Sequence, residues 1–295
     1  MRVAVLGPGG VGGLVAAALA GAGEDVVVVA REATAEVIAR HGLTVSSVLL
    51  GEFRATPRAT ARLDEDVDVL IVATKATALE GALDRVQAQP ALVVALLNGI
   101  EHLDVLRARF GAERVVAAVI RVDSHRPGPG RVVHTSQYLR IDLAGEGSAQ
   151  HEAIGRLAAA LERAGIPVRV GGSEADVMWS KLVRLNALAL TTSAFDAPIG
   201  EIRADPQMRA TLEAAITETA AVAAADGASI DRGTTLAELE QAHPELTSSM
   251  HRDIAEGRAP ELDAIAGAVL RAARRHGLTC PTVSELADQV ARRLS

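Results

Sequence analysis

Residues 2–13 read RVAVLGPGGVGG, a short apolar run that passes directly into a glycine-rich turn. The apolar part of this stretch is typical of a strand that is buried in a parallel sheet. Residues 14–22 then have a helical pattern, and residues 25–30 (DVVVVA) form a second apolar run. The order of strand, glycine turn, helix and strand predicts the first unit of a Rossmann-type α/β fold.

Three glycines of this turn, Gly7, Gly9 and Gly12, have the G-x-G-x-x-G spacing of a dinucleotide-binding loop. Gly7 permits the tight turn, Gly9 lets the backbone approach a pyrophosphate, and Gly12 lets the helix pack closely on the strand. The amides at the start of the helix, near Gly10 and Val11, would bind the phosphates. The alternative is a glycine-rich turn in an α/β fold that binds no nucleotide.

The residue after the second strand indicates which dinucleotide binds. Many NAD sites have Asp or Glu at this point, where it binds the ribose 2′-hydroxyl. This chain has Arg31 there, followed by Glu32, and a guanidinium group suits a 2′-phosphate. The sequence therefore favours NADPH as the cofactor. In the alternative, Arg31 is solvated and Glu32 binds the ribose.

Two polar residues follow later strands of the predicted sheet. The runs 68–73 and 91–96 predict buried strands, and Lys75 and Asn98 come after their carboxyl ends. Ligands of open α/β sheets collect at this edge, so we predict that both side chains contact the cofactor. Asn98 precedes Gly99, and its alternative role is that of a turn residue.

The region that follows predicts further strands. Residues 115–120 form one apolar run, and residues 121–145 have the alternation of late, partly antiparallel strands. His134 is expected to be a strand residue rather than a catalytic base. A helix at residues 155–164 and a short strand at residues 168–170 complete this part of the chain.

The strand pattern ends at Gly171-Gly172, and helical periodicity continues to the end of the chain. We predict a Rossmann NADP-binding domain over residues 1–171 and an all-helical substrate and dimerisation domain over residues 172–295. Ser173 is expected to cap the first helix. Further helices are predicted at residues 206–225, 248–256, 260–275 and 283–293.

Only two of the 30 basic residues are lysines, Lys75 and Lys181. Arginine cannot act as an acid near neutral pH, whereas burial or a neighbouring cation lowers the pKa of a lysine. Lys181 lies in an apolar helical stretch, where a lysine is costly unless it has a partner. We therefore expect a chemical role for Lys181. The alternatives are that both lysines survived by chance, or that Lys181 reaches solvent along its own helix.

The composition restricts the partners. Aromatic residues are 2% of the chain and the net charge is -7, both of which argue against nucleic-acid binding. The chain has no run of about 20 apolar residues, so we expect no membrane partner. The N-terminal apolar run is too short for a signal peptide, which favours a cytoplasmic protein. The single Cys280 excludes an internal disulfide framework, and we predict no metal site.

Together these motifs resemble the ketopantoate reductase (2-dehydropantoate 2-reductase) family. Its members are NADPH-dependent reductases of a 2-keto acid, with a Rossmann domain and a helical domain. The resemblance runs nearly from end to end. It is carried by the glycine loop, Arg31, Lys75, Asn98-Gly99, Lys181 within Trp179–Leu182, Pro198–Glu201, Ser248–Met250 and Glu261.

The resemblance implies a role for each of these residues. Lys181 matches the catalytic lysine, which donates a proton or a charged hydrogen bond to the developing alkoxide. Glu261 would orient Lys181 or bind a substrate hydroxyl. Asn98 and Ser249 would hold the substrate or the nicotinamide end of the cofactor.

Three positions depart from the family. It typically has asparagines where this chain has Leu185, Ala189 and Ile199, and Asn186 is displaced by one residue. Those asparagines help to hold polar groups of the substrate. We therefore expect a small 2-keto acid, with a less polar carbonyl compound as the alternative to ketopantoate. A non-catalytic NADP-binding sensor is a further alternative, although the retention of Lys181 and Glu261 weighs against it. We also expect a homodimer.

Overall fold

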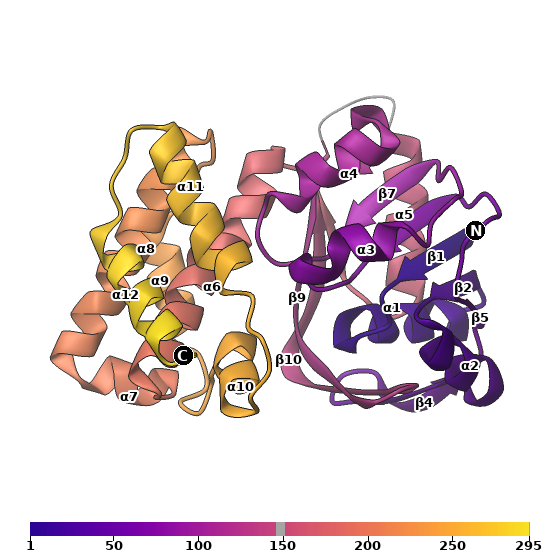
Figure 1. The fold of residues 1–295 in the computed structure, drawn as a ribbon, viewed down its shortest axis with the longest axis horizontal. Helices are drawn as coiled ribbons and strands as arrows, with labels where there is room; N and C mark the ends of the chain where they lie inside the picture. Colours follow the sequence, from indigo (N-terminus) through magenta and orange to yellow (C-terminus); the bar gives the residue numbers. More distant parts are fainter. Residues whose placement is uncertain (146–150, 295) are drawn as a thin grey trace. The chain divides into compact units, whose positions relative to one another are not determined.

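The computed structural model describes residues 1–145 and 151–294, which form two compact units. The first comprises Met1–Leu97 and Glu101–Val177, and the second comprises Asn98–Ile100 and Met178–Ser295. Figure 1 shows the sheets and helices of the first unit and the helices of the second. The predicted fold, a Rossmann domain followed by a helical domain, is confirmed. The division that we predicted at residue 172 lies within the first unit.

A six-stranded parallel sheet is the centre of the first unit. Its strands are β1 (Arg2–Leu6), β2 (Asp25–Val29), β5 (Arg58–Thr60), β6 (Val69–Val72), β7 (Leu92–Ala95) and β8 (Val115–Val116), in the order β5-β2-β1-β6-β7-β8. In the middle of the sheet, Val3 pairs with Val26 on one side and Val69 on the other, and all three are almost fully buried. Because the strands are parallel, the turns after β1, β2 and β6 lie at one edge.

Helices connect these strands. They are α1 (Gly10–Gly21), α2 (Glu32–His41), α3 (Leu79–Leu83, after a 3₁₀ turn at Ala76–Ala78) and α4 (His102–Phe110, before a 3₁₀ turn at Ala112–Arg114). Helix α1 is apolar on all sides because it contacts both sheets of this unit. Its burial between sheets explains a sequence without a polar face.

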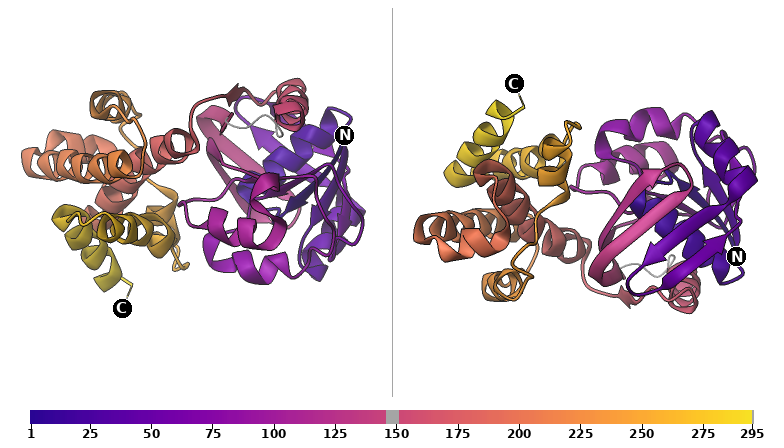
Figure 2. Two further views of the ribbon diagram at one scale, coloured as in Figure 1. Left: turned by 90° about the horizontal axis from the view of Figure 1, so that it is seen from above. Right: turned by 90° about the horizontal axis from the view of Figure 1, so that it is seen from below.

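A second sheet contains β3 (Leu43–Ser47), β4 (Gly51–Ala55), β9 (Ala118–Gly128), β10 (Arg131–Leu143) and β11 (Val168–Val170). Strands β9 and β10 are antiparallel, as predicted, and are seen in the right-hand view of Figure 2. Helix α5 (His151–Arg163) precedes β11. The prediction of one strand over residues 115–120 was wrong. The chain leaves the first sheet after Val116, and both pieces are buried, so hydropathy does not mark the break.

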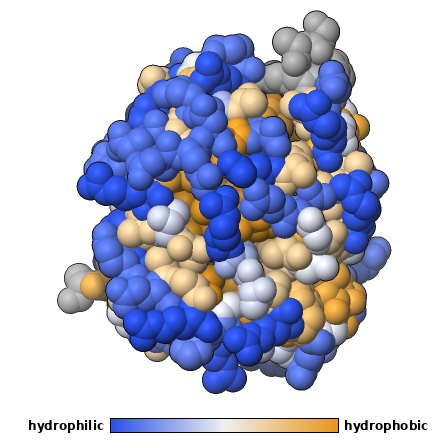
Figure 3. Space-filling model, turned by 90° about the vertical axis from the view of Figure 1, so that its right-hand side faces the viewer, coloured by the Kyte–Doolittle hydropathy of each residue, from blue (hydrophilic) through white to orange (hydrophobic). Residues whose placement is uncertain are grey.

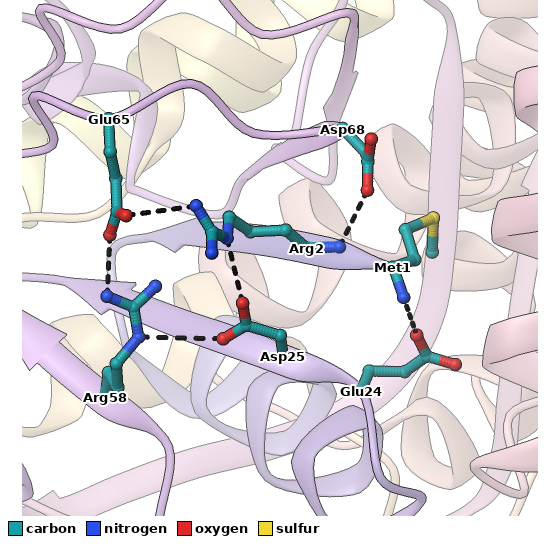
Figure 4. Close-up of polar contacts among 7 residues, drawn as sticks. All are labelled: Met1, Arg2, Glu24, Asp25, Arg58, Glu65 and Asp68. Atoms are coloured by element: carbon teal, nitrogen blue, oxygen red, sulfur yellow. Dashed lines mark hydrogen bonds and ion pairs between the residues drawn. The ribbon is translucent and has the colours of Figure 1, made fainter.

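An ion-pair network joins the amino ends of three strands of the first sheet (Figure 4). Arg2 on β1 contacts Asp25 on β2 at 2.8 Å and Glu65 at 3.1 Å. Arg58 on β5 contacts the same two carboxylates, at 3.6 and 2.7 Å. These charges lie at the edge opposite the glycine loop, so they support strand register rather than a cofactor.

The second unit is helical. Its helices are α6 (Glu174–Phe195, which begins in the first unit), α7 (Ile199–Ala204), α8 (Pro206–Ala225), α9 (Arg232–Glu240), α10 (Ser249–Ala255), α11 (Ala268–Arg275) and α12 (Pro281–Arg292). A π-helical turn at Asp263–Gly267 leads into α11. Side chains cap several N-termini: Ser173 accepts from the Asp176 N–H, and Asp205 caps α8.

The surface is mostly hydrophilic on the face drawn in Figure 3, with smaller apolar areas between the charged residues. Among the described helices, none combines the length and the apolar character that are needed to cross a membrane. In the same part of the chain, no group of three or more His, Cys, Asp and Glu side chains could hold a metal ion.

Candidate active site

The glycine loop has the geometry that its spacing predicts. Gly7 has a φ of +91°, and a Cβ there would lie 2.8 Å from Cγ2 of Thr74. The Gly7 N–H donates to the carbonyl of Val29 at 3.0 Å, which fixes the turn to the end of β2. A Cβ on Gly12 would overlap the carbonyl oxygen of Gly7. The turn and the close packing of α1 therefore both require glycine.

Gly9 is different because a Cβ there would meet no atom within 4 Å. It is the N-cap of α1, and no side chain caps this helix. A helix N-terminus that faces open space has N–H groups available for an anion, which fits the pyrophosphate of a dinucleotide. Within the described residues, the hydroxyls of Thr74 and Ser124 are buried without a hydrogen-bond partner, and both residues flank this loop.

The packing of α1 against β9 explains why position 10 is glycine. A Cβ at this position would overlap the backbone of Ser124 on β9. Its lack of a side chain therefore serves the contact between α1 and β9, whatever its amide binds. Val11 follows in the first turn of α1, with its side chain partly buried.

The end of β2 presents Arg31 as predicted. Arg31 is exposed and is the N-cap residue of α2. The neighbouring Glu32 carboxylate accepts a hydrogen bond from Nη1 of Arg85 at 3.0 Å. Hydrogen bonds from its own backbone N–H and from Arg85 hold the pKa of Glu32 below its usual value. Because Glu32 is engaged with Arg85, this arrangement weakens the alternative in which it binds the ribose.

Lys75 is exposed and follows β6 at the same edge of the sheet. It is the N-cap residue of the 3₁₀ turn Ala76–Ala78. This position is consistent with the predicted contact to the cofactor, which stays a prediction.

Lys181, Asn98 and Glu261 come together in the second unit. Nζ of Lys181 donates to Oδ1 of Asn98 at 2.9 Å, and Nδ2 of Asn98 donates to Oε2 of Glu261 at 2.9 Å. The amide thus turns its carbonyl to the ammonium group and its NH₂ to the carboxylate. All three side chains are partly buried, where such charge-assisted hydrogen bonds are strong.

The backbone explains why Asn98 is followed by glycine. Gly99 has a φ of +82°, and a Cβ there would overlap the carbonyl oxygen of Ala264. Ala264 lies in the π-helical turn that begins two residues after Glu261. Short π-helical turns are frequent at functional sites. The close approach of Gly99 and Ala264 holds Asn98 beside Glu261, so Asn98 is more than a turn residue.

Helix α6 carries Lys181 and two of the departures from the family, Leu185 and Ala189, whereas Ile199 begins α7. Leu185 is one turn further along the same face and is half-buried, whereas Ala189 and Ile199 are fully buried. Asn186 is also fully buried, and its amide donates to Oγ1 of Thr219 on α8 at 2.9 Å. The geometry places Asn186 in the packing of α6 against α8 and gives no support to its predicted contact with a substrate.

The two serines before Met250 have different environments. Ser248 is buried, caps α10 by accepting from the His251 N–H at 3.0 Å, and contacts the Thr192 hydroxyl at 3.0 Å. Ser249 is exposed. Only Ser249 therefore presents a hydroxyl that a ligand could reach, in keeping with the sequence prediction.

Sequence reasoning missed two features of this site. The first is the pairing of Glu32 with Arg85, which are 53 residues apart. The second is the contact of Gly99 with the π-helical turn. The Asn-Gly pair is a local signal for the second feature, but no local pattern indicates the first.

Two family models match the chain. "Ketopantoate reductase PanE/ApbA" matches residues 3–144, and "Ketopantoate reductase PanE/ApbA C terminal" matches residues 175–293. A 2-dehydropantoate 2-reductase of Caulobacter vibrioides is 30% identical over 288 residues, which cover 95% of this chain and 94% of the relative.

Solved structures share the fold. A 2-dehydropantoate 2-reductase from Geobacter metallireducens has a TM-score of 0.89 and 28% identity, with 99% of both chains covered. A D-mandelate dehydrogenase in a ternary complex with NADH and anilino(oxo)acetate has a TM-score of 0.89 at 23% identity, with 100% of this chain and 98% of that chain covered. At that identity the second likeness concerns the fold alone.

Proposed function

The chain belongs to the ketopantoate reductase family, whose members are oxidoreductases acting on a CH–OH/C=O pair, and we propose that it reduces a small 2-keto acid with NADPH. The observation that carries this proposal is the hydrogen-bonded chain Lys181–Asn98–Glu261. It gives the second unit a cationic donor in a fixed orientation, which the reduction of a carbonyl group requires.

A nicotinamide dinucleotide fits the first unit. The amides near Gly9 would bind its pyrophosphate, Arg31 its 2′-phosphate, and Lys75 another polar group of the cofactor. When bound, the cofactor supplies the hydride that reduces the carbonyl carbon. Support for NADPH over NADH comes from the exposed guanidinium of Arg31 and from the engagement of Glu32 by Arg85.

Lys181 would act on the carbonyl oxygen. An ammonium group has three N–H donors, so its contact with Asn98 is compatible with a further hydrogen bond to a substrate oxygen. As negative charge develops on that oxygen, Lys181 would stabilise it and transfer a proton to it. Through Asn98, Glu261 would orient the ammonium group of Lys181. Ser249 would bind the 2-keto acid substrate.

The substrate is proposed to be less polar than ketopantoate. Leu185 replaces an amide on the face of α6 that carries Lys181, so a substrate hydroxyl would lose a partner there. A buried hydroxyl without a partner costs about 1–3 kcal/mol. Homodimer formation and a cytoplasmic location stay predictions. A purely sensory role is disfavoured because the Lys181–Asn98–Glu261 chain is intact.

A turnover assay tests this function. NADPH oxidation would be followed with a panel of 2-keto acids that includes ketopantoate and acids with apolar side chains. We expect turnover, with ketopantoate below the best acid in kcat/KM. If none of the acids is reduced, the reductase assignment is refuted. If ketopantoate has the highest kcat/KM, the assignment of a less polar substrate is refuted.

A further inference from the structure

Three arginines gather at the carboxyl end of β2 around a single glutamate. Arg31 and Arg62 are exposed, and Arg85 binds the carboxylate of Glu32. Charges of Arg85 and Arg62 both act to lower the pKa of Glu32, which places Arg62 within electrostatic reach of that carboxylate. Three guanidinium groups near the Glu32 carboxylate favour the binding of an anion with more than one charge at this point of the sheet edge.

Backbone contacts hold Arg62 at this edge. The Ala30 N–H donates to the carbonyl of Thr60 at 3.0 Å, so the end of β5 lies beside the residue that precedes Arg31. The Thr60 hydroxyl donates to the carbonyl of Arg62 at 2.7 Å and accepts from its N–H at 3.2 Å. The turn therefore fixes the backbone of Arg62 and leaves its side chain out of these bonds.

The following residue ties this turn to Arg85. The Leu63 N–H donates to the carbonyl of Arg85 at 2.8 Å, and the guanidinium of Arg85 donates to the carbonyl of Ala61 at 3.2 Å. One set of contacts thus positions both arginines.

We propose that Arg62 is a second specificity-determining residue for the 2′-phosphate of NADPH, and that Arg85 is a positioning residue that withholds Glu32 from the 2′-hydroxyl of NADH. The proposal rests on the proposed function. Arg31 and Arg62 would each donate charge-assisted hydrogen bonds to the phosphate. Without Arg85, Glu32 would repel the phosphate and could accept a hydrogen bond from a ribose hydroxyl.

Binding of two nucleotide fragments tests the proposal without any turnover. Dissociation constants for adenosine 2′,5′-bisphosphate and adenosine 5′-monophosphate would be measured by calorimetry for the whole chain. The variants are Arg62→Gln and Arg85→Gln, with Arg62→Lys as a second variant that keeps the charge. Arg54→Gln is the control, since Arg54 is an exposed arginine of β4 in the other sheet. Thermal melting checks that each variant is folded.

Arg62→Gln should weaken the bisphosphate about five- to twentyfold and the monophosphate less than about twofold, as expected for one charged hydrogen bond at an exposed site. Arg62→Lys should lose less affinity for the bisphosphate than Arg62→Gln, because it keeps the charge. Arg85→Gln should weaken binding of the bisphosphate and strengthen binding of the monophosphate, so that the two dissociation constants become more alike. An unchanged ratio in Arg62→Gln, equal weakening of both fragments, or the same loss in Arg54→Gln would overturn the proposal.

The outcomes also separate this inference from the assignment of NADPH. If the wild-type chain does not discriminate between the fragments, the NADPH preference itself fails. If it discriminates through Arg31 alone, with Arg62→Gln and Arg85→Gln unchanged, only the present inference fails.

Discussion

Lys181 is one of only two lysines in a chain that uses arginine at its other 28 basic positions. The structure gives it a partner, Asn98, that an arginine could also bind. The difference between the two side chains is therefore one of acidity rather than of charge, because a guanidinium group does not release a proton near neutral pH.

The exchange Lys181→Arg separates these properties. It should lower kcat by about 10²–10⁴, the usual contribution of a positioned acid, while the KM for NADPH changes little. The matched control is Lys75→Arg, which should be much milder because Lys75 is predicted to contribute charge to cofactor binding. Steady-state kinetics measure both. A Lys181→Arg enzyme within a few-fold of wild type would show that Lys181 acts only through its charge.

Arg31 carries the predicted cofactor preference. Arg31→Ala should raise the KM for NADPH about tenfold or more, which corresponds to the loss of a charge-assisted hydrogen bond. The KM for NADH should be nearly unchanged, since NADH has no 2′-phosphate. Kinetics with both cofactors measure the effect, and an equal loss with the two would remove the basis for the NADPH assignment.

At the scale of elements, the segment Asn98–Ile100 has its position fixed by the π-helical turn Asp263–Gly267. Gly99 is the contact point, because its positive φ and the adjacent carbonyl of Ala264 both exclude a side chain. The segment belongs to the second unit although the residues on either side of it belong to the first. Its one functional side chain, Asn98, therefore depends on a backbone contact rather than on a regular helix or strand.

Gly99→Ala should displace Asn98 and break the hydrogen-bonded chain that joins Lys181 to Glu261. We expect a loss of kcat that exceeds the change in the KM for NADPH. Gly257→Ala is the matched control, because Gly257 also has a positive φ, +67°, but a Cβ there meets no atom within 4 Å. The control should lose some stability and keep its kcat. Equal kinetic losses in the two variants would argue against the positioning role of Gly99.

Asp226 ties three helices together, since it accepts from Nε1 of Trp179 on α6 at 2.9 Å and contacts Nε2 of His276, after α11, at 2.8 Å. Burial alone would raise the pKa of Asp226, but these hydrogen bonds, together with the charges of His276 and Arg275, hold the pKa below its usual value. A lowered pKa stabilises the fold at pH values above the unfolded value of about 3.9, and this contribution is lost as the pH falls below it.

Urea unfolding of the wild type and of Asp226→Asn measures this contribution. The wild type should have the larger free energy of unfolding at pH 6, and the difference should shrink towards pH 3. A difference that is constant or grows at low pH would show that the Asp226 carboxylate does not stabilise this junction.

The elements that the sequence predicted correctly have local causes. The glycine loop is specified by three close positions, and β1, β2, β6 and β7 are apolar because both faces of the sheet are covered. Strands β3, β4 and β5 were not assigned, since they are short and partly exposed, and their pairing is decided by distant partners. The break after Val116 was missed because Ala117 is as buried as its neighbours and no polar residue marks it.

At the scale of the whole molecule, the proposed chemistry depends on residues that are far apart in the sequence. Asn98 and Glu261 are separated by 163 residues, and their contact follows from the fold rather than from any local pattern. Their roles were expected only from the resemblance to a family. Conversely, the interior position of Asn186 could not be read from its neighbours, because a shift of one residue on a helix turns a side chain by about 100°.

The most direct measurement of the central claim is the transfer of deuterium to the product from NADPH that carries deuterium at both C4 positions. Mass spectrometry would locate the label after incubation with the best 2-keto acid of the panel. We expect a 2-hydroxy acid that carries one deuterium at C2, formed by the wild type and at least about 10²-fold more slowly by Lys181→Arg. NADPH oxidation without label at C2, or labelled product formed equally fast by both proteins, would contradict the account.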